Sequence, residues 1–186
     1  MNSPGGIDAS SFSETWVAAS DYNLFFGNLS QKLGNISGPS DSSVVFGTTV
    51  SLSSDGHTLV TSSSYTWPGE VYVYTNYDDP YSWKLQNTIL APSNEYGYVM
   101  SWGESLEMSG DAQTLAVQGW DYIYIYKLEQ SSFSLVEEIA LSGSPKVSFS
   151  HNGTLISVTA KQQWYCNRTL KCTCVQMEAA QPITTV

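Results

Sequence analysis

The chain has 186 residues and a formal net charge of −10, from 7 Lys and Arg against 17 Asp and Glu. This balance argues against nucleic-acid binding, because phosphate contacts need clustered basic side chains. With 41% hydrophobic, 13% aromatic and 13% charged residues, the composition excludes a disordered chain, and the many Tyr, Trp and Ser residues favour sheet over helix. No signal peptide is visible near the N-terminus, and no apolar run is long enough to span a bilayer.

Short strands are predicted along the whole chain in a recurring order. Each group begins with a strand that alternates apolar and polar residues, as a half-buried strand does. In chain order the strands are expected at 14–18, 23–26 and 32–33, then at 50–53, 58–60, 70–74 and 83–85, then at 106–108, 114–117, 122–126 and 133–136, and finally at 147–149 and 154–158.

The recurring order comes from an internal repeat. Residues 46–60 read FGTTVSLSSDGHTLV and are echoed by WGESLEMSGDAQTLAV at 102–117, and EVYVY at 70–74 matches YIYIY at 122–126. Two weaker copies flank these. With one threonine of each copy as a mark, the repeats align at Thr15, Thr58, Thr114 and Thr154.

A tight turn follows the first strand of each copy. Asp55-Gly56 and Asn152-Gly153 both suit a turn with positive φ. Asp111 is followed by Ala112 instead of glycine, so we expect a turn of a different type there.

The strand at 70–74 puts valines on one face and tyrosines on the other, so both faces have apolar groups to bury. Units of three or four strands stacked face to face are typical of propeller blades. We therefore predict an all-β, propeller-like array of about four antiparallel blades over residues 1–160, approximately at 6–43, 44–100, 101–143 and 144–165, followed by a cysteine-containing tail at 161–186.

The order Phe-Gly, alternating strand, Asp-Gly turn, Thr-Leu-Val and Val-Tyr-Val-Tyr resembles the FG-GAP repeat, which builds the seven-bladed β-propeller of integrin α-chain heads. The resemblance is strong in two copies and weak in two. It implies structural roles for Phe46, Gly47, Asp55, Gly56, Trp102, Gly103, Asp111, Asn152 and Gly153. The Gly-Ala-Pro step of the family is absent, and the boundary near Pro145 has lost its Phe-Gly.

The number of copies also departs from the family, because four blades do not close a seven-bladed ring. The chain is then part of a longer product, or other subunits complete it, or its units fold differently. An open array leaves sheet faces or edges exposed, so we expect other protein subunits to complete or cover the terminal blades. The resemblance favours an extracellular, cell-surface or particle-associated location and an adhesion or structural role.

We expect no cofactor and no resident metal. Calcium is the alternative that the resemblance suggests, but the Asp-x-Asp-x-Asp-Gly loop of calcium-binding members is missing, and Asp78-Asp79 is the only acidic doublet in a predicted loop.

No catalytic signature is present, and we predict that the protein is not an enzyme. His57 and His151 both fall in predicted turns, and no Gly-x-Ser-x-Gly elbow or phosphate-binding glycine loop occurs. Glu137 and Glu138 are adjacent on a strand and therefore point to opposite faces.

The three cysteines, Cys166, Cys172 and Cys174, cannot all pair within one chain. A disulfide between Cys172 and either neighbour is one reading, and a metal site that adds His151 is a weaker one. Glycosylation triplets begin at Asn28, Asn35, Asn152 and Asn167.

Aromatic residues gather in two insertions relative to the repeat. Tyr and Trp dominate interface hot spots and stack on sugars, although the same side chains could instead pack at blade edges. The predicted binding residues are Tyr65, Trp67, Tyr77, Asp78, Asp79, Tyr81 and Trp83, whereas Trp102 and Trp120 are expected in the core.

The leading functional hypothesis is a non-enzymatic propeller module for protein–protein contact or for structure within an assembly or at a surface. A carbohydrate-binding or adhesion module that uses the loops of residues 65–83 is the alternative. A propeller-based hydrolase comes third, since fold alone does not exclude one.

Overall fold

The computed structural model describes residues 7–9, 15–20, 23–28, 31–38, 46–64, 68–79, 81–94, 97–98, 101–141, 146–149 and 156–159. All regular elements in these ranges are strands, which confirms the predicted all-β class. None of these segments forms an apolar helix of membrane-spanning length. The cysteines, His151, Asn152, Gly153 and Asn167 lie outside the described residues.

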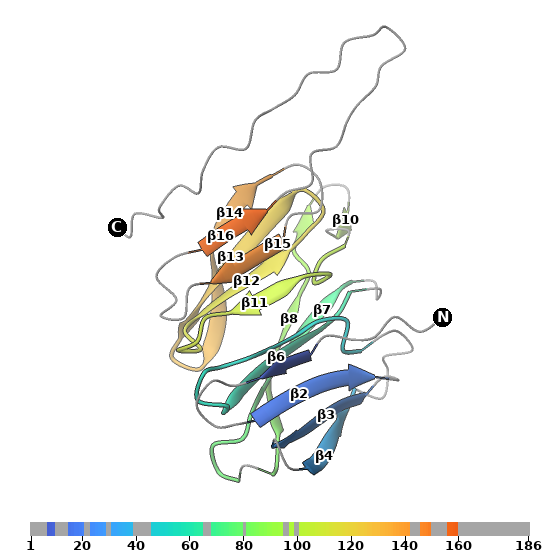
Figure 1. Ribbon diagram of the computed structural model, residues 1–186. Coiled ribbons are helices and arrows are strands. Elements are labelled where there is room, and N and C mark those ends of the chain that lie inside the picture. Colours follow the sequence, from blue (N-terminus) through green and yellow to red (C-terminus); the bar gives the residue numbers. More distant parts are fainter. Residues whose placement is uncertain are drawn as a thin grey trace, which may run out of the picture.

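The strands form successive antiparallel sheets, which we call blades 1 to 4 (Figure 1). Within each blade, strands follow in chain order from the innermost outward. Blade 1 holds β1 (Ile7–Ala9), β2 (Thr15–Ser20), β3 (Asn23–Asn28) and β4 (Gln31–Ser37); blade 2 holds β5 (Val50–Leu52), β6 (Thr58–Ser63), β7 (Glu70–Thr75) and β8 (Lys84–Leu90); blade 3 holds β11 (Leu106–Met108), β12 (Thr114–Gln118), β13 (Tyr122–Glu129) and β14 (Ser132–Ala140); and the described part of blade 4 holds β15 (Lys146–Phe149) and β16 (Ile156–Thr159). The short pair β9 (Ser93–Asn94) and β10 (Gly97–Tyr98) lies between blades 2 and 3 in the chain.

The blades share one pairing register. Val50 pairs with Thr61, and Leu106 pairs with Val117 at the equivalent place. The third and fourth strands of blades 1, 2 and 3 carry a register shift at one equivalent point, between Phe26 and Gly27, between Val73 and Tyr74, and between Ile125 and Tyr126. The repeat is therefore present in the backbone of blade 1 as well, where the sequence shows it only weakly.

Blade 4 corrects the sequence alignment by one residue. Phe149 pairs with Ile156, as Leu52 pairs with Leu59. Both pairs are seven positions apart in the chain, so position 154 aligns with His57 and not with Thr58.

The two faces of blade 2, and likewise those of blade 3, are buried against different neighbours, as predicted for the Val-Tyr-Val-Tyr strand. Val71 and Val73 share a core with Tyr124 and Tyr126 of blade 3. Tyr72 and Tyr74 face the other way and share a core with Leu24, Phe26 and Ile36 of blade 1. At the next junction Ile123 and Ile125 pack with Val147. Each junction buries apolar area on two sheets, which supplies most of the stability.

The turn at Asp111 is the same as the turn at Asp55, so the prediction of a different type is wrong. Ala112 has φ 59° and Gly56 has φ 74°. Ser109 Oγ donates to Asp111 Oδ1 at 2.6 Å and accepts from Thr114 N at 2.9 Å, and Ser53 makes the matching pair of bonds. These bonds hold the turn in the left-handed region even without glycine.

Of the two tryptophans expected in the core, only one is there. Trp102 is 0% exposed and follows the same plan as Phe46, with Gly103 and Gly47 both at φ 86°. Trp120 is 51% exposed in the bend between β12 and β13, so its predicted core position is wrong. It follows a glycine and precedes Asp121, where the chain leaves the sheet.

Candidate functional site

The loop between β7 and β8, residues 76–83, is the most prominent insertion in blade 2. Its counterpart in blade 3 is the short turn at 130–131. The loop is tied to the turn between β5 and β6: His57 Nδ1 lies 2.8 Å from Asn76 Oδ1, and the Asn76 N–H donates to the His57 carbonyl at 3.1 Å. His57, expected only as a solvated turn residue, therefore anchors the base of this loop.

Tyr77 extends the contact with the turn. Its ring lies 5.3 Å from the His57 ring, and its hydroxyl lies 3.1 Å from Thr58 Oγ1. The side chain is nevertheless 62% exposed. Tyr77 is thus fixed in position while most of its ring remains available to a partner.

The acidic doublet shapes the loop. Asp79 Oδ1 accepts the Tyr81 N–H at 2.9 Å, and the Asp79 carbonyl accepts the Ser82 N–H. Asp78 Oδ2 lies 2.6 Å from Lys84 Nζ, and this hydrogen bond lowers the pKa of Asp78 and raises that of Lys84. Both side chains are largely exposed, so the ion pair orders the loop more than it stabilises the fold. Among the described residues no group of three His, Cys, Asp or Glu side chains converges as a metal site.

A first cleft of about 360 Å³ opens on one side of the loop, between blades 2 and 3. Its floor is apolar, formed by Val73, Leu128 and Phe133, and Tyr77 and Asp78 stand at its rim. The rest of the lining is mostly amide and hydroxyl side chains, which include Gln86, Asn87, Gln113, Gln130 and Ser131. The cleft can therefore take a neutral ligand with an apolar group and several hydrogen-bonding groups.

A second cleft of about 520 Å³ opens on the other side of the loop, between blades 1 and 2. Trp83 lies in it, edge-on to Phe26 with the ring centroids 6.0 Å apart. The buried Trp83 Nε1 finds no acceptor among the described residues. Tyr81, 63% exposed, and Leu85 form the outer wall of this cleft.

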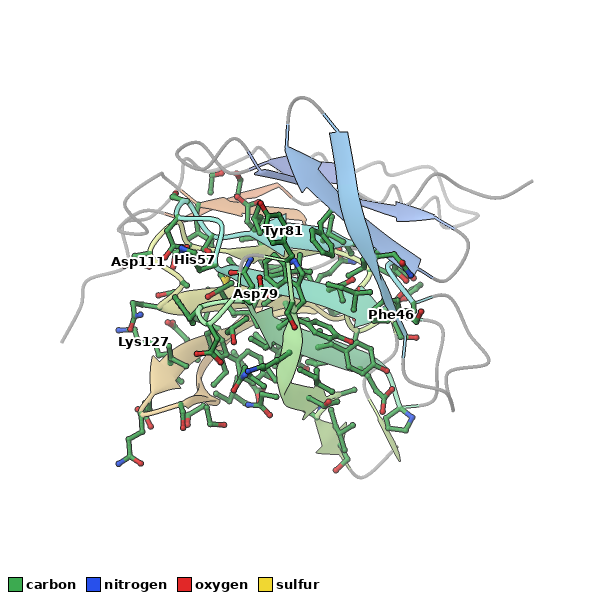
Figure 2. All side chains as sticks on the ribbon, turned by 90° about the horizontal axis from the view of Figure 1, so that it is seen from below. Phe46, His57, Asp79, Tyr81, Asp111 and Lys127 are labelled. Carbon is green, nitrogen blue, oxygen red and sulfur yellow. The ribbon has the colours of Figure 1, made fainter. Side chains whose placement is uncertain are left out.

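The structure thus brings together part of the predicted binding set. Tyr77, Asp78, Asp79, Tyr81 and Trp83 all belong to the loop and its two clefts. Tyr65 and Trp67 lie outside the described residues, and their described neighbours Ser64 and Pro68 sit at the opposite end of β7 from Thr75. Figure 2 shows the two ends of the blades, with His57 and Asp111 on one side and Phe46 on the other.

Sequence reasoning missed the amides on the far wall of the first cleft. Gln113 and Gln130 come from turns of blade 3, more than thirty positions along the chain from Tyr77. Phe26 of blade 1 was likewise not expected beside Trp83. Local patterns carry no signal for these residues, because only the packing of neighbouring blades places them at the loop.

Comparison with known proteins shows which solved structures share this fold. No protein-family profile and no curated protein matches the sequence. Among solved structures, the Cps50 (Swd1) β-propeller domain of Myceliophteria thermophila is similar with a TM-score of 0.63 and 12% identity, over 84% of this chain and 50% of that one. KlAtg21, solved in complex with the coiled-coil of AgAtg16, has a TM-score of 0.59 and 14% identity, over 82% of this chain and 49% of that one.

A candidate 6-phosphogluconolactonase of Bacteroides fragilis is similar with a TM-score of 0.56 and 9% identity, over 84% of this chain and 42% of that one. These identities show the fold alone, which is a β-propeller-like array, as predicted. The chain spans about half the length of the structures it matches. The FG-GAP family itself is not singled out by them and stays a prediction.

Proposed function

We propose that this protein is a non-enzymatic propeller module that binds a polypeptide partner through the 76–83 loop and the two clefts beside it. The observation that carries the proposal is the geometry of the loop, which presents two exposed tyrosines above two blade-junction clefts. Concave sites at junctions with apolar floors and a few polar groups are typical of binding sites. Exposed, well-anchored tyrosines are typical of interface hot spots.

The lining favours a polypeptide over a charged ligand. The first cleft offers carboxamides, which both donate to and accept from a peptide backbone, around an apolar floor that suits one side chain. Its two charged residues, Asp78 and Lys84, neutralise each other. A protein partner also accords with KlAtg21, a similar propeller solved with a coiled-coil.

Three further proposals, on the repeat family, the partners and the location, follow from the sequence repeat. We infer that the blades are FG-GAP-like, that other protein subunits complete or cover the terminal blades, and that the module acts in an assembly or at a cell or particle surface. These rest on the resemblance of residues 46–60 and 102–117 to that repeat.

Random-peptide phage display on the full chain, followed by affinity measurements on the selected peptides, tests the binding proposal. Tyr77→Ala and Tyr81→Ala should each weaken binding by roughly tenfold or more, as hot-spot truncations do. Trp120→Ala removes another exposed aromatic side chain, at the opposite end of blade 3, so it is the control and should bind as the unmodified chain does. Equal affinity in all three variants would reject the loop as the binding site.

A carbohydrate-binding role is the second candidate, and the observation in its favour is the exposed Tyr77 ring beside the amides of the first cleft. A glycan array with Tyr77→Ala, Trp67→Ala and Trp83→Ala variants tests the carbohydrate-binding role, since unchanged glycan binding in all three variants would remove it. A hydrolase has less support, because the His57 ring is hydrogen-bonded to the side-chain amide of Asn76 and His57 lines neither cleft.

A further inference from the structure

Three neighbouring segments border the first cleft, and hydrogen bonds join them to one another. They are the 76–83 loop, the turn between β5 and β6, and the turn between β11 and β12. The Asn76 N–H donates to the His57 carbonyl at 3.1 Å, which ties the loop to the first turn. The Ser54 N–H donates to the Gly110 carbonyl at 2.9 Å, which ties the first turn to the second. The rim of the cleft is therefore one connected surface shared by blades 2 and 3.

This rim is acidic, although the cleft inside it is neutral. Asp55 lies in the first turn, Asp111 in the second, and Asp78 and Asp79 in the loop. All four side chains are exposed. Asp78 is paired with Lys84, whereas no described cationic side chain lies within ion-pair distance of the other three aspartates. The apolar floor is thus surrounded by three carboxylates without a described counter-charge.

The three aspartates are held in fixed positions by their own turns. In each of them Oδ1 accepts the N–H of the residue two positions later, at 2.9 Å in Asp55 and Asp79 and at 3.0 Å in Asp111. Among the described residues no donor binds the second carboxylate oxygen of any of the three. A cationic partner can therefore bind these oxygens while the aspartates lose little further side-chain freedom.

The charges on the outer part of β13 leave this balance unchanged. Leu128 packs against the core shared by blades 2 and 3. Lys127 and Glu129 are its neighbours in the strand, so they point to the opposite face, away from the first cleft. Their charges are also opposite in sign, so together they add no net charge near the cleft.

We propose that the partner segment bound at the first cleft is basic, with one apolar side chain on the cleft floor and Lys or Arg side chains beside it bound to the aspartates of the rim. The inference rests on the proposed function and names the class of its partner. Val73, Leu128 and Phe133 form a floor that favours an apolar side chain. A cleft of about 360 Å³ lies at the small end of binding pockets, so it suits one side chain with its adjoining backbone.

Charge selects this occupant over a neutral or an acidic segment. An exposed ion pair strengthens binding by roughly two- to fivefold, and the rim offers three such contacts, at Asp55, Asp79 and Asp111. The formal charge of −10 on the whole chain also attracts a cationic segment over a distance at low salt. An acidic segment is repelled by the rim and by the chain as a whole.

The test begins with random-peptide phage display on the full chain at low salt, about half the ionic strength at which the Debye length is about 10 Å. Selected peptides that no longer bind Tyr77→Ala depend on the loop. We expect these peptides to carry Lys or Arg on both sides of an apolar residue. Replacing that apolar residue of the peptide by serine should weaken binding by roughly tenfold or more.

Affinities of the loop-dependent peptides are then measured with variants of the rim. Asp79→Asn and Asp111→Asn should each weaken binding by roughly two- to fivefold at low salt, and by less at high salt, which screens exposed charges. Asparagine keeps the Oδ1 acceptor that holds each turn. Glu137→Gln removes the same charge from an exposed site opposite Ile125, which packs toward blade 4, so it is the matched control and should bind as the unmodified chain does.

The other outcomes overturn the inference. Loop-dependent peptides of neutral or acidic composition would exclude a basic partner and leave the proposed function standing, whereas selection of no loop-dependent peptide would remove both. Equal affinity for Asp79→Asn, Asp111→Asn and Glu137→Gln would mean that basic peptides respond to the overall charge of the chain and not to the rim. Equal affinity of the serine-substituted peptide would show that the floor is not used.

Discussion

Replacing Ser51 by alanine should weaken the junction between blades 2 and 3 measurably. Ser51 Oγ is the acceptor for the Met108 N–H, and both residues are buried. Alanine leaves that N–H without an acceptor and without water. An orphaned buried donor costs about 1–3 kcal/mol, and for a chain of this size each kcal/mol lowers Tm by roughly 2–4 °C.

The measurement is urea unfolding followed by tryptophan fluorescence at one fixed protein concentration, with thermal unfolding beside it. Ser131→Ala, an exposed serine in the turn between β13 and β14, is the matched control and should change the free energy of unfolding by less than about 0.5 kcal/mol. If Ser51→Ala destabilises no more than this control, the hydrogen bond does not contribute as argued.

Three further predictions concern the turn, the core and the loop. Gly103→Ala should destabilise the protein by about 2 kcal/mol in urea unfolding, because φ is +86° and the new Cβ would lie 3.0 Å from Ser62 Cβ; an unchanged midpoint would contradict it. Burial raises the pKa of Tyr74 to about 12, so the protonated phenol favours the folded state. This stability is complete below pH 10 and falls by up to about 2 kcal/mol as the pH rises from 10 to 12. Tyr74→Phe should flatten the fall, and an equally steep profile in the variant would refute the assignment. His57→Ala should speed hydrogen exchange in residues 76–83 and weaken peptide binding without changing exchange in β13; equal exchange in the loop would show that His57 does not anchor it.

The sequence was sufficient to predict the blades because their determinants are local. The alternation at 70–74 places valines and tyrosines on opposite faces whatever their neighbours are, and the structure buries both faces as expected. Gly47 and Gly103 precede the first strands of their blades and take the same positive φ. Such features depend on strand period and turn chemistry, which a single sequence records.

What was not predictable depends on contacts between distant residues. Ala112 adopts a glycine-like conformation because Ser109 and Asp111 hydrogen-bond around it, a network that outweighs the local preference of alanine. The first cleft joins Tyr77 to Gln113 across a blade junction. In blade 4 the Thr-Leu pair of the sequence lies one position closer to the Asn-Gly turn than in blade 2, and only the pairing of Phe149 with Ile156 reveals the register.

The alternation of faces has a thermodynamic consequence for the whole array. Among the described residues, Val71 and Val73 pack toward blade 3 and Tyr72 and Tyr74 pack toward blade 1, so the apolar contacts couple each described sheet to its immediate neighbours. A chain of such couplings behaves as a one-dimensional cooperative system, in which unfolding starts at the ends and the middle is protected longest. Blades 2 and 3, each packed against a neighbour on both faces, are then expected to be the best protected of the described blades, and the 76–83 loop is attached to blade 2.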